Sequence, residues 1–346
     1  MTDKQITPPR NAQASNQANR IPWLDVSRGL AFLMVIYSHL DFCNDTIMRY
    51  FSPVFLTTFF FVSGYLFKEG YSFSKVLEQR TRTLFLPFLQ LGLIMIVMSQ
   101  IMTFKEKVPF FDHVVGLLSQ NGENQLLWFV AALYVYSIIF FWIEKISHGA
   151  TGLLIISFLL FLLNRLAIEM GLPRIPWHLA SFGYACFYMG LGKYYKEKED
   201  VINRIIDNKW FVLLMAIWYV LIISIFDLRI SYAGGKFVFD AWCLTIPGLV
   251  VMIFLSRRLL QNNRLLLFVG ANSLFYFAFH GKIFSVLQAI CYKVVPESMS
   301  AIFGFYDLIA FIIVIFDALI LIIPAMFVNR YCPFLLGKGF KLWKAK

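Results

Sequence analysis

Charge is scarce in this sequence: Asp, Glu, Lys and Arg make up only 15% of the 346 residues, whereas 59% are hydrophobic. A typical soluble domain has about 25% charged and about 45–50% apolar residues. The deficit excludes an ordinary soluble enzyme. In its place, apolar runs close to the roughly 17–25 residues that cross a bilayer recur along the chain. We therefore expect a polytopic membrane protein.

Cysteine is also scarce and shows no pattern. There is no C-x-x-C motif and no regular spacing of the kind that a disulfide framework or a zinc site requires. We therefore expect neither a disulfide scaffold nor a metal site. The five cysteines are Cys43, Cys186, Cys243, Cys291 and Cys332.

The apolar runs are continuous rather than alternating, which favours helices over the strands of a barrel. We expect an all-α protein with one membrane-embedded domain over residues 21–346, crossing the bilayer about ten times. The expected spans are residues 24–42, 51–68, 84–103, 126–143, 150–168, 178–195, 209–226, 239–256, 265–288 and 302–328.

The net charge of +11 would suit nucleic acid, but the distribution of the charge indicates membrane topology instead. If the N-terminus is cytoplasmic, 22 of the 31 Lys and Arg residues fall in cytoplasmic segments, as the positive-inside rule requires. We expect both termini in the cytoplasm, a plasma membrane location (the inner membrane of a bacterium) and no nucleic-acid partner. Residues 1–20, which are polar and rich in Gln and Asn, are expected to be a disordered tail without a cleaved signal.

Ionisable side chains within spans need an explanation, because each costs at least about 2.5–3.5 kcal/mol in hydrocarbon and usually faces a cavity or a partner. Such residues are Asp25, Arg28 and His39 in the first span, His280 in the ninth and Asp317 in the tenth. Asp317 is expected to be protonated or paired, with a partner that the sequence does not identify.

Arg28 and His39 are eleven residues apart, about 20° past three full helical turns, so a continuous helix would project both from one face, roughly 16 Å apart. Asp25 lies one turn before Arg28 and can pair with it. The alternative is that Arg28 only anchors the helix at the interface and His39 only packs. The shared face favours a functional stripe that runs from the cytoplasmic mouth into the membrane.

Six segments resemble the acyltransferase-three family of polytopic membrane O-acyltransferases and follow that family's order along the chain, although the segment 182–195 is quoted last below. The first carries Arg, ten residues and His, and the fifth is similar to that family's late Ser, Tyr and His segment, with an offset spacing. The sixth resembles the branch described as fucose O-acetylase-like. The segments are "LDVSRGLAFLMVIYSH" (24–39), "FFFVSGYLF" (59–67), "RTRTLFLPF" (80–88), "LWFVAALYV" (127–135), "NSLFYFAFHGKIF" (272–284) and "FGYACFYMGLGKYY" (182–195).

The resemblance implies transfer of an acyl group, usually acetyl, from coenzyme A to a hydroxyl of a surface or lipid-linked glycan. A neutral imidazole can take the proton of an attacking hydroxyl, which typically contributes 10²–10⁴ in rate. We expect His39 to be that base, with Arg28 in the same catalytic stripe. Acetyl-CoA or another acyl-CoA is the expected donor, and its phosphates call for arginines at the cytoplasmic mouth. Arg28, Arg80 and Arg82 are the candidates, although the last two also fit ordinary loop charge.

Weaker candidates for the substrate pocket each have a structural alternative. Ser63 is either an acyl-enzyme nucleophile or, without a nucleophile elbow, a site of close helix packing. Trp128 lines the pocket or belongs to an interfacial aromatic belt. His280 orients the acceptor, partners His39 or makes a structural hydrogen bond. Asp25, Tyr65 and Asp317 complete this group.

A second function class fits ten spans with buried charges, namely a secondary transporter or glycan exporter. Transporters often contain two related halves with helices broken at matching positions. The sequence has no such pairing, which favours the enzyme.

Overall fold

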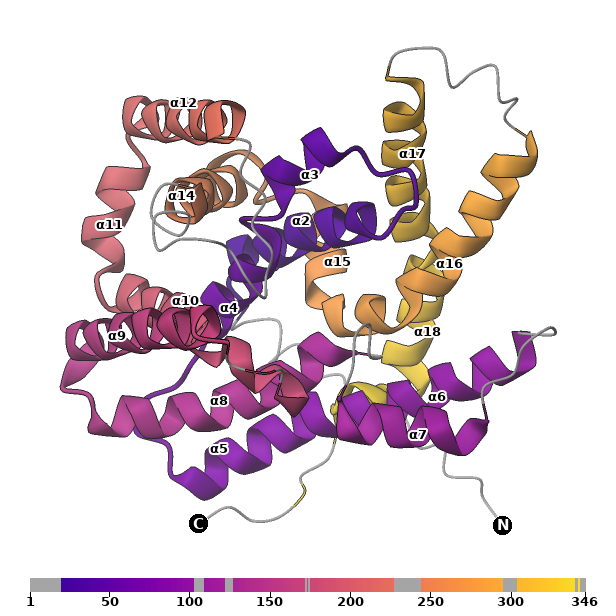
Figure 1. The fold of residues 1–346 in the computed structure, drawn as a ribbon, viewed down its shortest axis with the longest axis horizontal. Coiled ribbons are helices and arrows are strands. Elements are labelled where there is room, and N and C mark those ends of the chain that lie inside the picture. The colour runs from indigo at the N-terminus through magenta and orange to yellow at the C-terminus, as the bar shows by residue number, and fades with distance from the viewer. Residues whose placement is uncertain are drawn as a thin grey trace, which may run out of the picture.

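The computed structural model describes residues 20–102, 109–121, 127–171, 173, 175–226, 244–294, 304–339 and 342, and these ranges contain helices and no strands (Figure 1). The all-α prediction is confirmed. The expected tail at residues 1–20 lies, but for Arg20, outside the described residues. The helices are α2 (Pro22–Ser38), α3 (Asp45–Phe51), α4 (Phe55–Tyr65), α5 (Phe73–Arg80), α6 (Leu86–Met102), α7 (Phe110–Ser119), α8 (Trp128–Ile146), α9 (Gly149–Glu169), α10 (Phe182–Glu197), α11 (Glu199–Ile206), α12 (Lys209–Phe226), α14 (Ile246–Phe254), α15 (Arg264–Ala271), α16 (Ser273–Val294), α17 (Phe305–Ile320) and α18 (Ile322–Tyr331).

By length and composition, six helical segments in the described ranges can cross a membrane, and a seventh counts if α11 and α12, bent by 74°, form one broken span. The six match expected spans. Two other expected spans are shorter helices: α2 has 17 residues and α10 has 16. Of the expected span 239–256, residues 239–243 lie outside the described residues, and the rest contains α14, with nine residues. The six segments are Asp45–Tyr65, Phe73–Ile101, Trp128–Ile146, Gly149–Glu169, Ser273–Val294 and Phe305–Tyr331.

Close backbone contacts hold the central helices together. A Cβ on Gly64 in α4 would lie 1.9 Å from the Met189 carbonyl oxygen of α10, and one on Gly270 in α15 would lie 1.7 Å from the Asp25 carbonyl oxygen of α2. Only glycine permits helices to approach this closely, as at small-residue interfaces in membranes. The Ser-Gly pair of the second motif therefore serves helix packing through its glycine.

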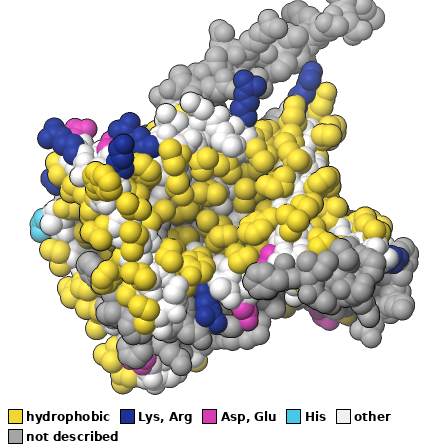
Figure 2. Space-filling model, turned by 90° about the horizontal axis from the view of Figure 1, so that it is seen from above, with side chains coloured by type: hydrophobic (Ala, Val, Ile, Leu, Met, Phe, Trp, Pro, Cys, Tyr) yellow, Lys and Arg dark blue, Asp and Glu magenta, His cyan; other side chains and the backbone are white. Residues whose placement is uncertain are grey.

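The outer surface is apolar. Figure 2 shows hydrophobic side chains over most of one face, with Lys and Arg side chains toward its edges. Large apolar residues on the outside of α9, α12 and α17 include Leu163 (62% exposed), Trp210 (75%) and Leu308 (59%). A soluble monomer rarely exposes contiguous apolar patches of this kind, so the surface fits a lipid environment.

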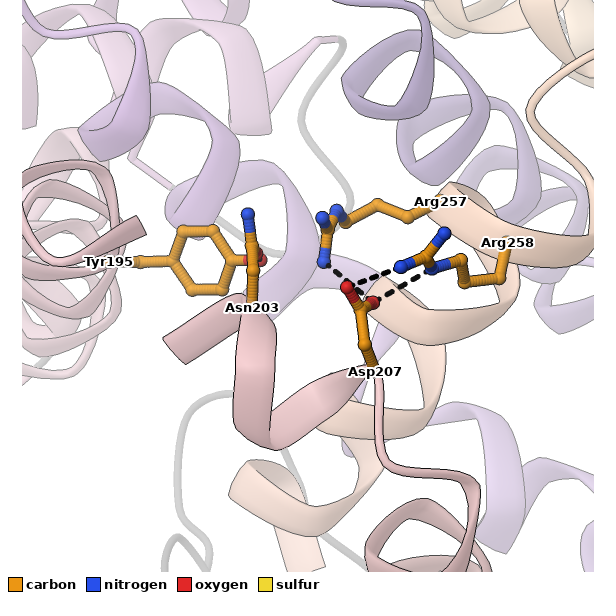
Figure 3. A network of polar contacts seen from close by, with 5 residues as sticks. All are labelled: Tyr195, Asn203, Asp207, Arg257 and Arg258. Carbon is orange, nitrogen blue, oxygen red and sulfur yellow. Dashed lines mark hydrogen bonds and ion pairs between the residues drawn. The ribbon is translucent and has the colours of Figure 1, made fainter. Parts of the chain in front are cut away.

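A polar network ties α10 and α11 to the π-helical turn η4 (Leu255–Leu259) that follows α14 (Figure 3). The guanidinium group of Arg258 donates two hydrogen bonds to the Asp207 carboxylate, at 2.9 and 2.5 Å, and Arg257 donates one at 3.3 Å. The Tyr195 hydroxyl donates to Asn203 Oδ1 at 2.5 Å. Arg257 and Arg258 therefore link these elements through Asp207, in addition to contributing to the positive charge expected on the cytoplasmic side.

Candidate active site

A pocket of about 350 Å³ lies between α2, α4, α5, α8, α15, α16 and the C-terminal segment, and four cationic side chains border it. The cations are Arg28, Arg80, Arg82 and Lys338. They come from α2, the end of α5, the following π-helical turn η1 (Thr81–Phe85) and the C-terminal segment. The structure thus brings together the three arginines predicted to bind the donor.

Arg28 is held in place by Asp25. The Arg28 guanidinium donates to the Asp25 carboxylate one helical turn earlier, as the spacing predicts. Asp25 itself is 6% exposed and does not border the pocket. Its role is therefore to position Arg28 rather than to contact a substrate there.

Arg80 and Arg82 differ in the contacts that their guanidinium groups make within the protein. Arg82 Nε lies 3.2 Å from Glu78 Oε1, and its Nη1 donates to the Gly337 carbonyl at 3.1 Å. Arg80 lies over the Phe67 ring at 5.8 Å, and no ion pair joins it to another residue in the described ranges. The π-helical turn η1 begins directly after Arg80 and contains Arg82, so the wider turn sets the direction of both side chains toward the pocket. Such π-helical turns are frequent at functional sites.

Ser63 borders the same pocket, but its hydroxyl donates to the Phe59 carbonyl of its own helix at 2.8 Å. Among the described residues no histidine is hydrogen-bonded to it. A serine nucleophile needs a base within about 2.6–3.2 Å. This arrangement favours the packing interpretation over the nucleophile.

Aromatic rings close the inner end of the pocket. Phe277 of α16 stacks on Phe129 of α8 at 5.3 Å and 17°, and Phe59 of α4 packs against both. Beyond Phe277, the Phe32 ring of α2 lies 4.8 Å from Phe277 and 5.3 Å from the His280 ring. A continuous file of rings therefore leads from the arginine pocket to His280.

His39 lies at the far end of this file, not in the arginine pocket. Helix α2 ends at Ser38, so His39 is its C-cap, with φ −101° and ψ −3°, rather than part of a continuous helical face. Its side chain is exposed, and its ring stacks on His280 at 5.4 Å and 19° and on Phe284 at 6.4 Å and 29°. The predicted stripe on α2 thus ends in a histidine pair formed with α16.

The hydrogen bond of His280 defines its tautomer. Nδ1 lies 2.8 Å from the Tyr276 carbonyl oxygen, which can only accept, so Nδ1 carries a proton. In a neutral ring, Nε2 is then an acceptor. That atom is buried and has no hydrogen-bond partner in the described part of the chain. His280 thus stacks on His39 and also makes a hydrogen bond within its own helix, so two of the arrangements considered for it occur together.

The remaining candidates lie elsewhere. Asp317 in α17 is fully buried, and neither carboxyl oxygen has a hydrogen-bond partner among the described residues. The Tyr65 hydroxyl donates to Glu199 Oε2 at 2.7 Å, and its ring packs edge-on against Trp23. Trp128 packs on His178 at 4.4 Å and does not border the pocket. The structure does not bring these three residues to the arginines.

Some bordering residues were not predicted. Lys338 donates to Asn329 Oδ1 at 2.5 Å, and Asn329 donates to Asn272 Oδ1 at 2.7 Å, so a polar chain runs from the C-terminal segment to the end of α15. Phe277 was likewise missed. The only signal in the sequence was its position three residues before His280, which places both on one helix face.

Together, the helices, the apolar exterior and the cationic pocket define a multi-pass membrane protein with an internal site. Residues 21–336 match the family model described as an acyltransferase domain. The chain therefore belongs to the acyltransferase-three family and is a membrane acyltransferase, as the ordered motifs predict. Searches of curated proteins and of solved structures find no match.

Proposed function

We propose that this protein is an O-acyltransferase of the plasma membrane (a bacterial inner membrane) that moves an acyl group, acetyl in the first instance, from acyl-CoA to a hydroxyl of a surface or lipid-linked glycan. The observation that carries the proposal is the convergence of Arg28, Arg80 and Arg82 from separate segments on one pocket. The family supports the acyl transfer, and the pocket supports an anionic donor.

The arginines suit the phosphate groups of coenzyme A. Guanidinium groups make paired, charge-assisted hydrogen bonds to phosphate oxygens. Arg80, which has no ion pair within the described ranges, has its charge free for this contact. Arg82 and Arg28 are already oriented by Glu78 and Asp25. The donor phosphates bind at these residues.

The acyl end of the donor then extends past Phe277 toward the histidine pair. Coenzyme A carries its thioester on a long, flexible arm, so phosphates and acyl group can occupy distant parts of one path. Phe277 and Phe32, whose rings are in contact at 4.8 Å, lie between the pocket and the histidine pair, so the acyl arm would displace these rings as it passes. The apolar lining excludes water, which protects the thioester from hydrolysis.

At the end of the path His39 is the general base. Its ring takes the proton from the acceptor hydroxyl as the hydroxyl oxygen attacks the acyl carbonyl carbon. The carbon–sulfur bond breaks, and the proton passes to the thiolate, so that the products are an O-acyl ester and coenzyme A thiol. His280 orients His39 by stacking against it.

A direct test uses the purified protein in nanodiscs with [¹⁴C]acetyl-CoA and the glycan and glycolipid fraction of the source cell's envelope, freed of esters by mild alkali. The proposal predicts alkali-labile radiolabel in that fraction and stoichiometric release of free thiol. Movement of glycan across liposome membranes with no label transferred would instead support an exporter.

A further inference from the structure

His280, Phe284 and Gln288 form a stripe on α16. This stripe contacts the residues that come directly after α2. Their spacing of four places them on one helix face. His280 and Phe284 stack on His39, and Gln288 hydrogen-bonds Asp41, two residues further along. One face of α16 therefore contacts both His39 and Asp41, the carboxylate two residues after it.

Gln288 fixes Asp41 at two points. Its amide nitrogen donates to Asp41 Oδ2, and its amide oxygen accepts the Asp41 backbone N–H at 3.4 Å. Gln288 is 4% exposed, whereas Asp41 is exposed. An exposed carboxylate needs no buried partner for its own solvation. A buried amide that bonds both the main chain and the side chain of one residue instead holds that carboxylate in one orientation.

Gln288 leaves most of this carboxylate available. An ionised carboxylate has about four lone-pair sites, and the amide nitrogen occupies one. The buried Nε2 of His280, a residue that is 7% exposed, also lacks a hydrogen-bond partner in the described ranges. Two groups that can accept hydroxyl protons are thus close to His39: His280, which stacks on it, and Asp41, two residues further along the chain.

Aromatic rings and a second amide–carboxylate pair adjoin Asp41. The Phe42 ring contacts Tyr292 at 5.9 Å and Tyr306 at 5.7 Å. Asn44 donates from Nδ2 to Asp307 Oδ2 at 3.0 Å. Ligand sites typically combine apolar ring surface with a few placed polar groups, and this set suits the carbon faces and hydroxyls of a sugar.

The charge here is opposite to that of the arginine pocket. Asp41 and Asp307 lie beyond the C-terminal end of α2, whereas Arg28 lies toward its N-terminal end. Carboxylates repel phosphate, so the donor is disfavoured at this end and a ligand rich in neutral hydroxyls is favoured.

From these contacts we infer that the segment after α2 is the acceptor subsite, at which Asp41, fixed by Gln288, accepts hydrogen bonds from sugar hydroxyls next to the one that attacks. The inference rests on the proposed function. It adds that donor and acceptor reach His39 from opposite ends of α2.

The test compares wild type with Asp41→Asn and Gln288→Leu, and with Asp45→Asn, at the first residue of α3, as a control carboxylate nearby in the chain. Asp41→Asn has the same shape and can still accept the Gln288 bond, so folding is preserved. The assay uses [¹⁴C]acetyl-CoA with the de-esterified envelope fraction described above, and each substrate is varied in turn.

Loss of a hydrogen bond to a charged group corresponds to roughly a 10- to 100-fold effect. We expect both variants to raise the apparent KM for the envelope fraction by at least tenfold, with the KM for acetyl-CoA within twofold of wild type and Asp45→Asn unchanged. Equal acceptor KM values for Asp41→Asn and Asp45→Asn, with normal transfer by wild type, would overturn the subsite and leave the transferase standing. If wild type transfers no label, the proposed function fails and the subsite with it.

Discussion

His39 and His280 stack with their rings 5.4 Å apart and 19° from parallel, although one ends α2 and the other lies within α16. Since His280 positions the base in this account, His280→Asn should lower kcat by about tenfold and His39→Ala by more. The double variant should be no slower than His39→Ala alone, because residues that act as a unit are not additive. Initial rates of thiol release measure this, with His178→Asn as a histidine control away from the pair. Additive losses would show that the two rings act independently.

The donor phosphates should depend more on Arg80 than on Arg82, because Arg82 already contacts Glu78 and Gly337. Arg80→Gln should raise the Kd for coenzyme A by about 10- to 100-fold, the range for a charge-assisted hydrogen bond, and Arg82→Gln by less. Isothermal titration with coenzyme A measures both. The exposed Arg264 on α15 provides the control substitution Arg264→Gln. An equal, small effect of all three changes would contradict phosphate binding at the pocket.

Phe277 should limit passage of the acyl group, because its ring lies between the arginine pocket and Phe32. Phe277→Trp adds volume in this path and should reduce kcat/KM for acetyl-CoA at least tenfold, while the Kd for coenzyme A without an acyl group stays within threefold. Titration and initial rates on the same preparation separate these effects. If both constants stay at the wild-type value, the acyl group takes another route.

Gly64 should be intolerant of a side chain, since its Cβ would lie 1.9 Å from the Met189 carbonyl oxygen. Gly64→Ala should cost at least about 1–3 kcal/mol, the usual range for overpacking, seen as a lower melting midpoint in detergent. Gly152→Ala in α9 is the matched control, because there the nearest atom would be 3.9 Å away. Equal midpoints for the two variants would be incompatible with this close packing of α4 on α10.

The link between Asp207 and Arg258 should make stability depend on pH. The hydrogen bonds from Arg258 lower the pKa of the Asp207 carboxyl below its ordinary value of 3.8. A carboxyl group whose pKa is lower in the folded state stabilises the fold. That stabilisation is fully present above the ordinary pKa and is lost as the pH falls through the pKa of the folded state. Asp207→Asn should therefore lower the melting midpoint at pH 5–7, and the difference should shrink below pH 3.8. A difference that is constant down to pH 3 would rule out this ion pair as its source.

The sequence predicted the helical class, most of the long spans and the arginines that share a pocket, because these follow from hydropathy and from short motifs. It did not predict the end of α2. Apolar residues continue through Leu40 and Phe42, so hydropathy alone extends the span past Ser38, where the helix stops. His39 therefore meets its neighbours through a turn and not through a helical face.

Long-range pairing also lay outside what the sequence could indicate. Nothing local to Asp41 identifies Gln288 as its partner, although the spacing of His280 and Gln288 did place both on one face of a helix. Similarly, the C-terminal segment reaches the pocket because Gly337 adopts φ +66° against the Arg82 backbone. These contacts depend on tertiary packing rather than on local pattern.

In the proposed reaction His39 removes the proton from the acceptor hydroxyl. The most direct measurement is the transfer rate of His39→Ala in nanodiscs with [¹⁴C]acetyl-CoA and the de-esterified envelope fraction, together with its Kd for coenzyme A. If His39 is the base, kcat falls by about 10²–10⁴, while the Kd stays within twofold of wild type and membrane insertion is normal. Transfer at the wild-type rate by His39→Ala would contradict it.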